Sequence, residues 1–156
     1  MLDPAVKAEI EELVGHWPIR AAGSVEALQV VQRHAGWVSD EHLRDVAELL
    51  GMSATELDGV ASFYNLLFRR PVGRHVVLVC DSVSCWTMGC DAVFSALRAE
   101  LGVDLAQTTP DGAFTVLPMC CLGDCDHAPV LMVGEDLHRN VDPEGVEALL
   151  APYRAR

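Results

Sequence analysis

The chain has 156 residues, of which 51% are hydrophobic and 22% charged, so it can fill the core of one domain or of two small ones and is not disordered as a whole. Its formal net charge is -12, and residues 1–70 carry 11 acidic and 6 basic side chains while residues 71–156 carry 12 and 5. Because no basic stripe could neutralise phosphates or anionic lipid, nucleic acid and bare membrane are poor candidate partners.

The longest apolar runs, residues 60–68 and 128–134, are far shorter than the roughly 20 residues that span a bilayer. The first residues alternate charged and apolar side chains, which is typical of a helix and not of a signal peptide. We therefore expect a cytoplasmic protein without direct membrane insertion. Thiols stay reduced in that compartment, so cysteines there favour metal binding over disulfides.

Capping residues and glycines predict four short helices in residues 1–70. Asp3 and Pro4 are suited to begin the first, and Ser53 with Glu56 has the spacing of a capping box for the fourth. The first three helices are expected at about residues 4–15, 24–36 and 39–51. The sequence thus predicts a small N-terminal helical subdomain, residues 1–70.

After Pro71 the pattern changes to apolar residues at every second position. A strand is predicted at residues 75–80, a helix at 91–102, and a turn containing Pro110 and Gly112 that leads into another strand. Two further strands and a helix capped by Asp142 follow. This order suits a small mixed sheet covered by helices, so the expected class is α+β or α/β, with a thioredoxin-like domain at residues 71–156.

All six cysteines lie in this second half, in two clusters near predicted strand ends: Cys80, Cys85, Cys90, Cys120, Cys121 and Cys125. A thioredoxin-type redox pair needs C-x-x-C, which is absent. Zinc favours close pairs, so Cys121 and Cys125 could form half of a zinc site. A 2Fe-2S cluster needs two thiolates on each of two irons and tolerates the wider C-x4-C spacing, so it is the favoured interpretation.

Spacing alone leaves the ligand set ambiguous. Cys80, Cys85 and Cys90 form two overlapping C-x4-C pairs, and Cys120 competes with Cys121. Neighbouring side chains on an extended backbone point to opposite faces, so Cys120 and Cys121 are not expected to reach the same cluster. Cys90 is expected to pack in the first turn of the following helix.

Two segments, "VCDSVSCWTMGC" at residues 79–90 and "CLGDCDHAP" at 121–129, closely resemble the small flavin-side iron–sulfur subunits of NADH:quinone oxidoreductase, respiratory complex I. The segment "GVASFYNLLFRRPVGRHV" at 59–76 also fits that family, so the likeness covers nearly the whole chain. The family pattern is C-x4-C, some 35 residues, then C-x3-C, and 35 residues separate Cys85 from Cys121 here. The resemblance implies the ligands Cys80, Cys85, Cys121 and Cys125.

The resemblance also implies one 2Fe-2S cluster and a larger flavoprotein partner that binds FMN and NADH. This chain has no G-x-G-x-x-G or P-loop, so we expect an electron-carrying subunit with no catalytic residues of its own. It would be peripheral to the inner membrane through the complex. Equivalent subunits of NAD-dependent formate dehydrogenases and NAD-reducing hydrogenases remain alternatives.

Four residues beside the motif cysteines have expected roles. Gly123 is expected to let backbone amides point at sulfur, or to be an ordinary turn glycine. Trp86 is expected to pack in the core, with shielding of the cluster or contact with the flavoprotein as the alternative. His127 is expected to be a surface or supporting residue and not a ligand. Carboxylates such as Asp124 are expected to disfavour the added electron and keep the potential low.

Two other classes of protein share some of these features. Residues 43–64 have the pattern of a helix-turn-helix, but the second helix carries Glu56 and Asp58 and no basic residue before Arg69, so packed helices with Val60, Phe63 and Leu67 toward the core are favoured over DNA binding. A stand-alone acidic ferredoxin is the other competitor. The helical half and its aromatic stretch, residues 62–68, favour a docked subunit instead.

Overall fold

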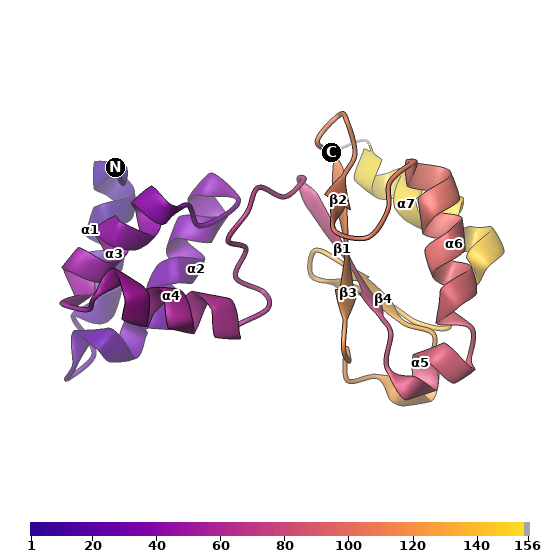
Figure 1. The fold of residues 1–156 in the computed structure, drawn as a ribbon, viewed down its shortest axis with the longest axis horizontal. Helices are drawn as coiled ribbons and strands as arrows, with labels where there is room; N and C mark the ends of the chain where they lie inside the picture. Colours follow the sequence, from indigo (N-terminus) through magenta and orange to yellow (C-terminus); the bar gives the residue numbers. More distant parts are fainter. Residues whose placement is uncertain (155–156) are drawn as a thin grey trace. The chain divides into compact units, whose positions relative to one another are not determined.

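The computed structural model describes residues 1–154, and the chain divides into two compact units, one over Met1–Pro71 and one from Val72 onward (Figure 1). The first unit is entirely helical. It contains a short 3-10 turn, η1 (Arg20–Gly23), and four helices: α1 (Pro4–Val14), α2 (Ser24–Ala35), α3 (Asp40–Leu50) and α4 (Ala54–Phe63).

The predicted starts of α1 and α4 are confirmed by their capping hydrogen bonds. Asp3 Oδ1 accepts from the amide of Ala5 at 2.8 Å. At the start of α4, Ser53 Oγ accepts from the Glu56 amide at 3.2 Å while Glu56 Oε2 accepts from the Ser53 amide at 2.9 Å. Each bond satisfies a backbone donor that has no partner inside the helix, so these short helices begin at defined residues.

The core of the first unit gathers one apolar stripe from each helix, including Ile10, Leu28, Val46 and Leu57, all nearly inaccessible to solvent. The prediction that Phe63 points into this core was wrong, because its side chain is 81% exposed. The buried face of α4 carries Leu57 and Ala61. At about 100° per residue, the position two after Ala61 lies on the opposite side of the helix.

The segment after α4 returns to the bundle through polar side chains. Gln32 Nε2 donates to the carbonyl of Leu66 at 2.8 Å, and its Oε1 accepts from the amide of Phe68 at 2.6 Å. Arg69 donates to Asp40 at 2.6 Å and to Asp58 at 2.9 Å. The first basic residue after the would-be recognition helix is thus already paired with two carboxylates, which argues against DNA binding by this helix pair.

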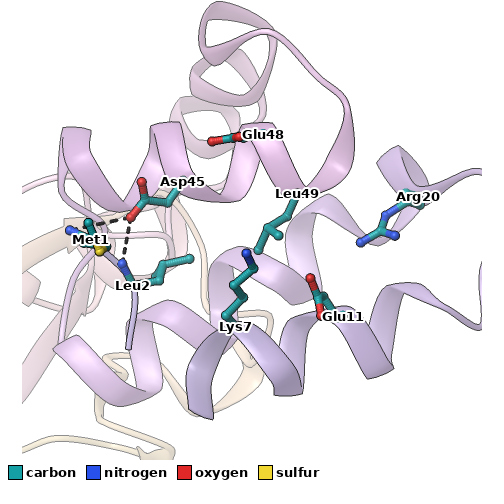
Figure 2. A pocket seen from close by; sticks show the side chains of 8 residues that line it. All are labelled: Met1, Leu2, Lys7, Glu11, Arg20, Asp45, Glu48 and Leu49. Carbon is teal, nitrogen blue, oxygen red and sulfur yellow. Dashed lines mark hydrogen bonds and ion pairs between the residues drawn. The ribbon is translucent and has the colours of Figure 1, made fainter. Parts of the chain in front are cut away.

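A hollow of about 490 Å³ in the first unit is lined by the N-terminal residues and by α1, η1 and α3. Figure 2 shows the side chains that line it. Cations such as Lys7 and Arg20 and anions such as Glu48 share its wall, and Asp45 accepts from the amide of Leu2 at 2.7 Å. No cysteine lines it, so it is separate from the metal chemistry suggested by the sequence.

The second unit is built on a five-stranded mixed sheet of order β2-β3-β1-β4-β5, in which only β1 and β3 are parallel. Its strands are β1 (His75–Cys80), β2 (Gln107–Thr108), β3 (Phe114–Met119), β4 (Leu131–Val133) and β5 (Asp136–His138). Its helices are α5 (Val83–Thr87), α6 (Cys90–Leu101) and α7 (Val146–Arg154), with 3-10 turns η2 (Cys125–His127) and η3 (Pro143–Gly145).

Helices α6 and α7 lie along the same side of the sheet (Figure 1). The core between these helices and the sheet contains two alternate residues of β1, Val77 and Val79. Leu97 of α6 and Leu150 of α7 belong to the same core. Successive side chains of a strand point to opposite faces, so Val77 and Val79 share the face of the sheet that packs against these helices. Among residues 1–154, no helix is long and apolar enough to cross a bilayer.

Most predicted elements of the second unit are present, and two were missed. The turn before β3 is confirmed by a 2.8 Å bond from the amide of Gly112 to the carbonyl of Thr109. The two-residue β2 and the five-residue α5 were not predicted. Both are too short for a periodic pattern to appear in the sequence, and they form only because neighbouring elements pair or pack with them.

Candidate metal centre

The two cysteine clusters meet because β1 and β3 are parallel neighbours. The last residue of β1, Cys80, is in register with the last residue of β3, Met119. The carboxyl ends of parallel strands lie at one edge of a sheet, so the loops that follow them emerge side by side. A 3.0 Å bond from the amide of Asp81 to the carbonyl of Met119 links the starts of these two loops.

Each of the four motif cysteines has a defined place at this edge. Cys80 ends β1 and Cys85 lies in α5, and both are only 1% exposed. Cys121 follows β3, and Cys125 begins η2, which packs against α5. Both of these later cysteines are exposed. Half of the thiols are therefore enclosed by protein and half face outward.

The four thiols form a connected chain of interactions. The Sγ atoms of Cys121 and Cys125 are 3.8 Å apart. Cys80 is near enough to both Cys85 and Cys125 to raise the pKa of each of these thiols. The structure thus brings C-x4-C and C-x3-C together from segments 35 residues apart.

The thiols oppose one another's ionisation. Burial, together with the neighbouring Cys80, raises the pKa of Cys85 to about 11. The pKa of Cys125 is raised chiefly by its hydrogen bond with Cys121 and then by the charge of Cys121. A group of thiols that resists deprotonation by itself needs a positive centre to become a set of thiolates, and metal ions supply that charge.

A backbone hydrogen-bond donor points at one of these sulfurs. The Gly123 amide lies 3.3 Å from Cys121 Sγ, which confirms the expected role of this glycine, and Gly123 adopts a positive φ of 81° that favours glycine. The Val130 backbone and the Ser84 side chain lower the pKa of Cys85 and of Cys125 respectively, against the larger effects that raise both values. Donors to sulfur stabilise thiolate charge and tune the potential of iron–sulfur centres. No local pattern indicated Ser84 or Val130, because their roles depend on the folded loop.

The remaining two cysteines differ from each other. Cys90 is the first residue of α6, as expected, and is 1% exposed in a small cluster with Cys80, Cys85, Ala128 and Val130. Burial raises the pKa of its thiol. Cys120 is exposed and takes no part in the sulfur contacts described above. Cys90 is close enough to Cys80 to interact with it.

Trp86 was expected in the core, and that prediction was wrong: its side chain is 62% exposed. In the short helix α5 the buried position is Cys85, and adjacent helix positions are about 100° apart, so Trp86 turns outward. Val83 and Met88 are also exposed, at 71% and 62%. An apolar surface therefore lies next to a motif cysteine.

An ionic cluster supports the second cysteine loop. Asp124 Oδ1 lies 2.9 Å from His127 Nδ1, and Asp124 Oδ2 accepts from Arg139 Nε. The Arg139 guanidinium, with His127 second, lowers the pKa of Asp124 below its usual range. Asp124, Asp126 and His127 also form a group with three metal-type ligand atoms close together, but Arg139 already supplies a cation to it. His127 serves as a supporting residue here.

The residues at the sheet edge fit a 2Fe-2S cluster. Such a cluster spreads four thiolates over two irons, so the four sulfurs need not surround a single point. Soft sulfur donors, an amide donor to sulfur and an apolar shell that includes Ala128 and Val130 are all present. The Ala128–Pro129 peptide bond is cis, between the loop and β4.

Residues 10–154 match the sequence profile of the thioredoxin-like 2Fe-2S ferredoxins. The chain belongs to that family. Its fold and the nature of its cofactor, one 2Fe-2S cluster, are those of the family. Curated relatives include the E subunit of NADH-quinone oxidoreductase from Pseudomonas aeruginosa, 45% identical over 98% of this chain and 92% of that protein. Its counterpart from Escherichia coli K12 is 44% identical over the same shares.

Among solved structures, a chain of an NAD+-reducing NiFe hydrogenase in the H2-reduced state superposes with a TM-score of 0.73. It is 23% identical, and the match covers 86% of this chain and 22% of the hydrogenase chain. At that identity the likeness concerns the fold of this family, which recurs inside a much longer polypeptide.

Proposed function

We propose that this chain is the small electron-transfer subunit of an NADH:quinone oxidoreductase, respiratory complex I. The observation that carries the proposal is the convergence of two cysteine loops on one sheet edge in a chain whose relatives at 44–45% identity are named as a subunit of that enzyme. The hydrogenase likeness, at 23% identity, supports the alternative complex less well. The proposed cluster ligands are Cys80, Cys85, Cys121 and Cys125.

The bound cluster would take up and return one electron, changing its formal charge from about -2 to about -3. The chain's own residues enclose and orient it. The buried Cys80 and Cys85 and the exposed Cys121 and Cys125 would hold it. Electron exchange with a partner is therefore expected on the Cys121–Cys125 side.

NADH and FMN belong, in this proposal, to a larger flavoprotein partner, because this chain lacks a nucleotide-binding fingerprint. The exposed Val83, Trp86 and Met88 on and beside α5 give that partner an apolar surface close to the cluster. The protein would be cytoplasmic and peripheral to the inner membrane through the complex, with no catalytic residue of its own.

The test is anaerobic purification of the tagged full chain from cells that make it at native level. A complex I subunit should bring the flavoprotein and the membrane quinone-reducing subunits with it, whereas a molybdenum subunit or a hydrogenase would indicate one of the alternatives. Iron and sulfide analysis of the chain produced and purified without its partners should give about two of each per chain. Absence of the 2Fe-2S absorption and EPR signals would overturn the proposal.

A further inference from the structure

The Cys121–Cys125 loop holds one carboxylate that is enclosed and paired. Asp124 directly precedes Cys125, and its side chain is 15% exposed while that of Asp126 is 80% exposed. Both of its oxygens are engaged, one by His127 and the other by Arg139. Asp124 is thus part of a fixed arrangement, whereas Asp126 is largely solvated.

Arg139 comes from outside the cysteine motif, immediately after β5. The two residues that follow it bind the same loop through the backbone: the Asn140 amide donates to the carbonyl of His127 at 2.8 Å, and the Val141 amide donates to the carbonyl of Pro129 at 2.9 Å. The ion pair and these two bonds hold residues 139–141 against the segment that carries Cys125. Asn140 adopts a positive φ of 47°, which turns the chain at this point.

The charge of this pair matters because the proposed cluster becomes more negative on reduction. A bare carboxylate beside Cys125 would disfavour the incoming electron, as the sequence suggested for Asp124. The Arg139 guanidinium offsets the charge of Asp124, so the two side chains beside the cluster form a nearly neutral pair. The pair is partly exposed, since 56% of the Arg139 side chain is accessible, and salt will screen its effect.

We propose that Arg139 is a positioning residue for the cluster loop, holding Asp124 and Cys125 in place and cancelling the carboxylate's effect on the cluster potential. The inference rests on the proposed function, in that the loop must hold the cluster. Arginine suits the role because its charge is permanent and its planar guanidinium has directional donors, while lysine offers only a point charge.

The experiment is a double-mutant cycle on the anaerobically purified full chain, read by redox titration and by the rate of iron loss to a chelator. Arg139→Gln leaves the Asp124 carboxylate uncompensated and should lower the midpoint potential. Asp124→Asn leaves the guanidinium uncompensated and should raise it. The double variant should return the potential to near the wild-type value, because the pair is again neutral.

The rates of iron loss should rank the variants differently from the midpoint potentials, because iron loss reports the geometry of the loop. Both single variants and the double variant should lose iron about 10-fold faster than wild type, because each lacks the ion pair. Arg139→Lys should keep the wild-type potential and lose iron at an intermediate rate. If Arg139→Gln is too unstable to keep its cluster while Arg139→Lys keeps it, that result also supports the positioning role.

Arg98→Gln is the matched control. It removes the same charge from the far end of α6, where Arg98 pairs with Asp104 at 2.9 Å, and should change neither readout. Unchanged potential and iron retention in both Arg139→Gln and Asp124→Asn would overturn the inference, as would an equal shift with Arg98→Gln. A wild-type chain without a 2Fe-2S signal would instead overturn the proposed function.

Discussion

Cys121 Sγ lies 3.8 Å from Cys125 Sγ, while the preceding cysteine, Cys120, is exposed and outside the sulfur contacts. The turn at Gly123 closes the C-x3-C loop so that the amide of that glycine reaches Cys121 at 3.3 Å. Two adjacent cysteines with the same local composition thus have different surroundings, and they should differ in their importance for the cluster.

Cys120→Ser is expected to keep the 2Fe-2S cluster, and Cys121→Ser to lose it or to change it severely. An exposed thiol outside the sulfur contacts contributes nothing to iron binding, whereas serine at a ligand position replaces a soft thiolate with a hard oxygen. Iron and sulfide content and the EPR spectrum of the reduced protein check this. Equal loss in both variants would show that the assignment of Cys121 is wrong.

Cys90→Ala is expected to retain the cluster and to lower the free energy of unfolding by about 1 kcal/mol, the cost of removing one buried atom of methylene size. Cys90→Ser should cost more, because it buries a hydroxyl in an apolar cluster. Urea unfolding followed by circular dichroism gives the stabilities, and absorption gives cluster content. Loss of the cluster in both variants would make Cys90 a ligand.

Gly73→Ala should lower the free energy of unfolding by about 1–3 kcal/mol, because a Cβ there would lie 2.9 Å from backbone atoms of Phe114 in β3. Gly123→Ala is its counterpart in the cluster loop. Nothing lies within 4 Å of a Cβ at that position, so the cost is only that of the positive φ, about 1–2 kcal/mol.

The two glycine variants should affect different measurements. Gly73→Ala should shift the urea midpoint with a normal EPR spectrum, and Gly123→Ala should chiefly speed iron loss, since its strain falls on the loop that holds Cys121. The reverse pattern would contradict the geometry of the Cys121–Cys125 loop.

Ser53→Ala is expected to destabilise the helical unit by about 1 kcal/mol through loss of the cap of α4.

The bonds from Ser53 lower the pKa of Glu56 below its ordinary 4.5. The stability that the Glu56 charge adds is therefore present above pH 4.5 and is lost as the pH falls through the lower pKa of the folded state. The difference in urea midpoint between wild type and Glu56→Gln should therefore be present at neutral pH and shrink in acid. A difference that is constant with pH would exclude a role for the carboxylate charge.

Trp86→Glu should leave cluster content unchanged and reduce recovery of the partner flavoprotein when the tagged chain is purified. The residue is 62% exposed beside Cys85, so the change costs little within the chain but puts a charge on the proposed contact. Phe63→Glu, at an exposed aromatic of the helical unit, tests in the same way whether that surface also binds a partner. Unchanged recovery with Trp86→Glu would place the contact elsewhere.

Local signals in the sequence determined much of this protein. Caps such as Ser53 with Glu56 and the apolar run of residues 76–80 act within a few residues, so helix starts and strand β1 could be predicted. The spacing of the cysteines favoured a 2Fe-2S cluster, and the family resemblance supplied the four candidate ligands. Likewise, the acidic excess argues against nucleic acid partners without any knowledge of the fold.

The tertiary structure decided the features that depend on segments far apart in the chain. The parallel pairing of β1 with β3 places the cysteine loops together, and residues 139–141 reach back to the second loop, which pairs Asp124 with Arg139. Burial is also a property of the whole fold, and for that reason Phe63 and Trp86 were assigned wrongly to the core. An aromatic side chain fits either environment, and only the packing of the neighbouring elements selects one of them.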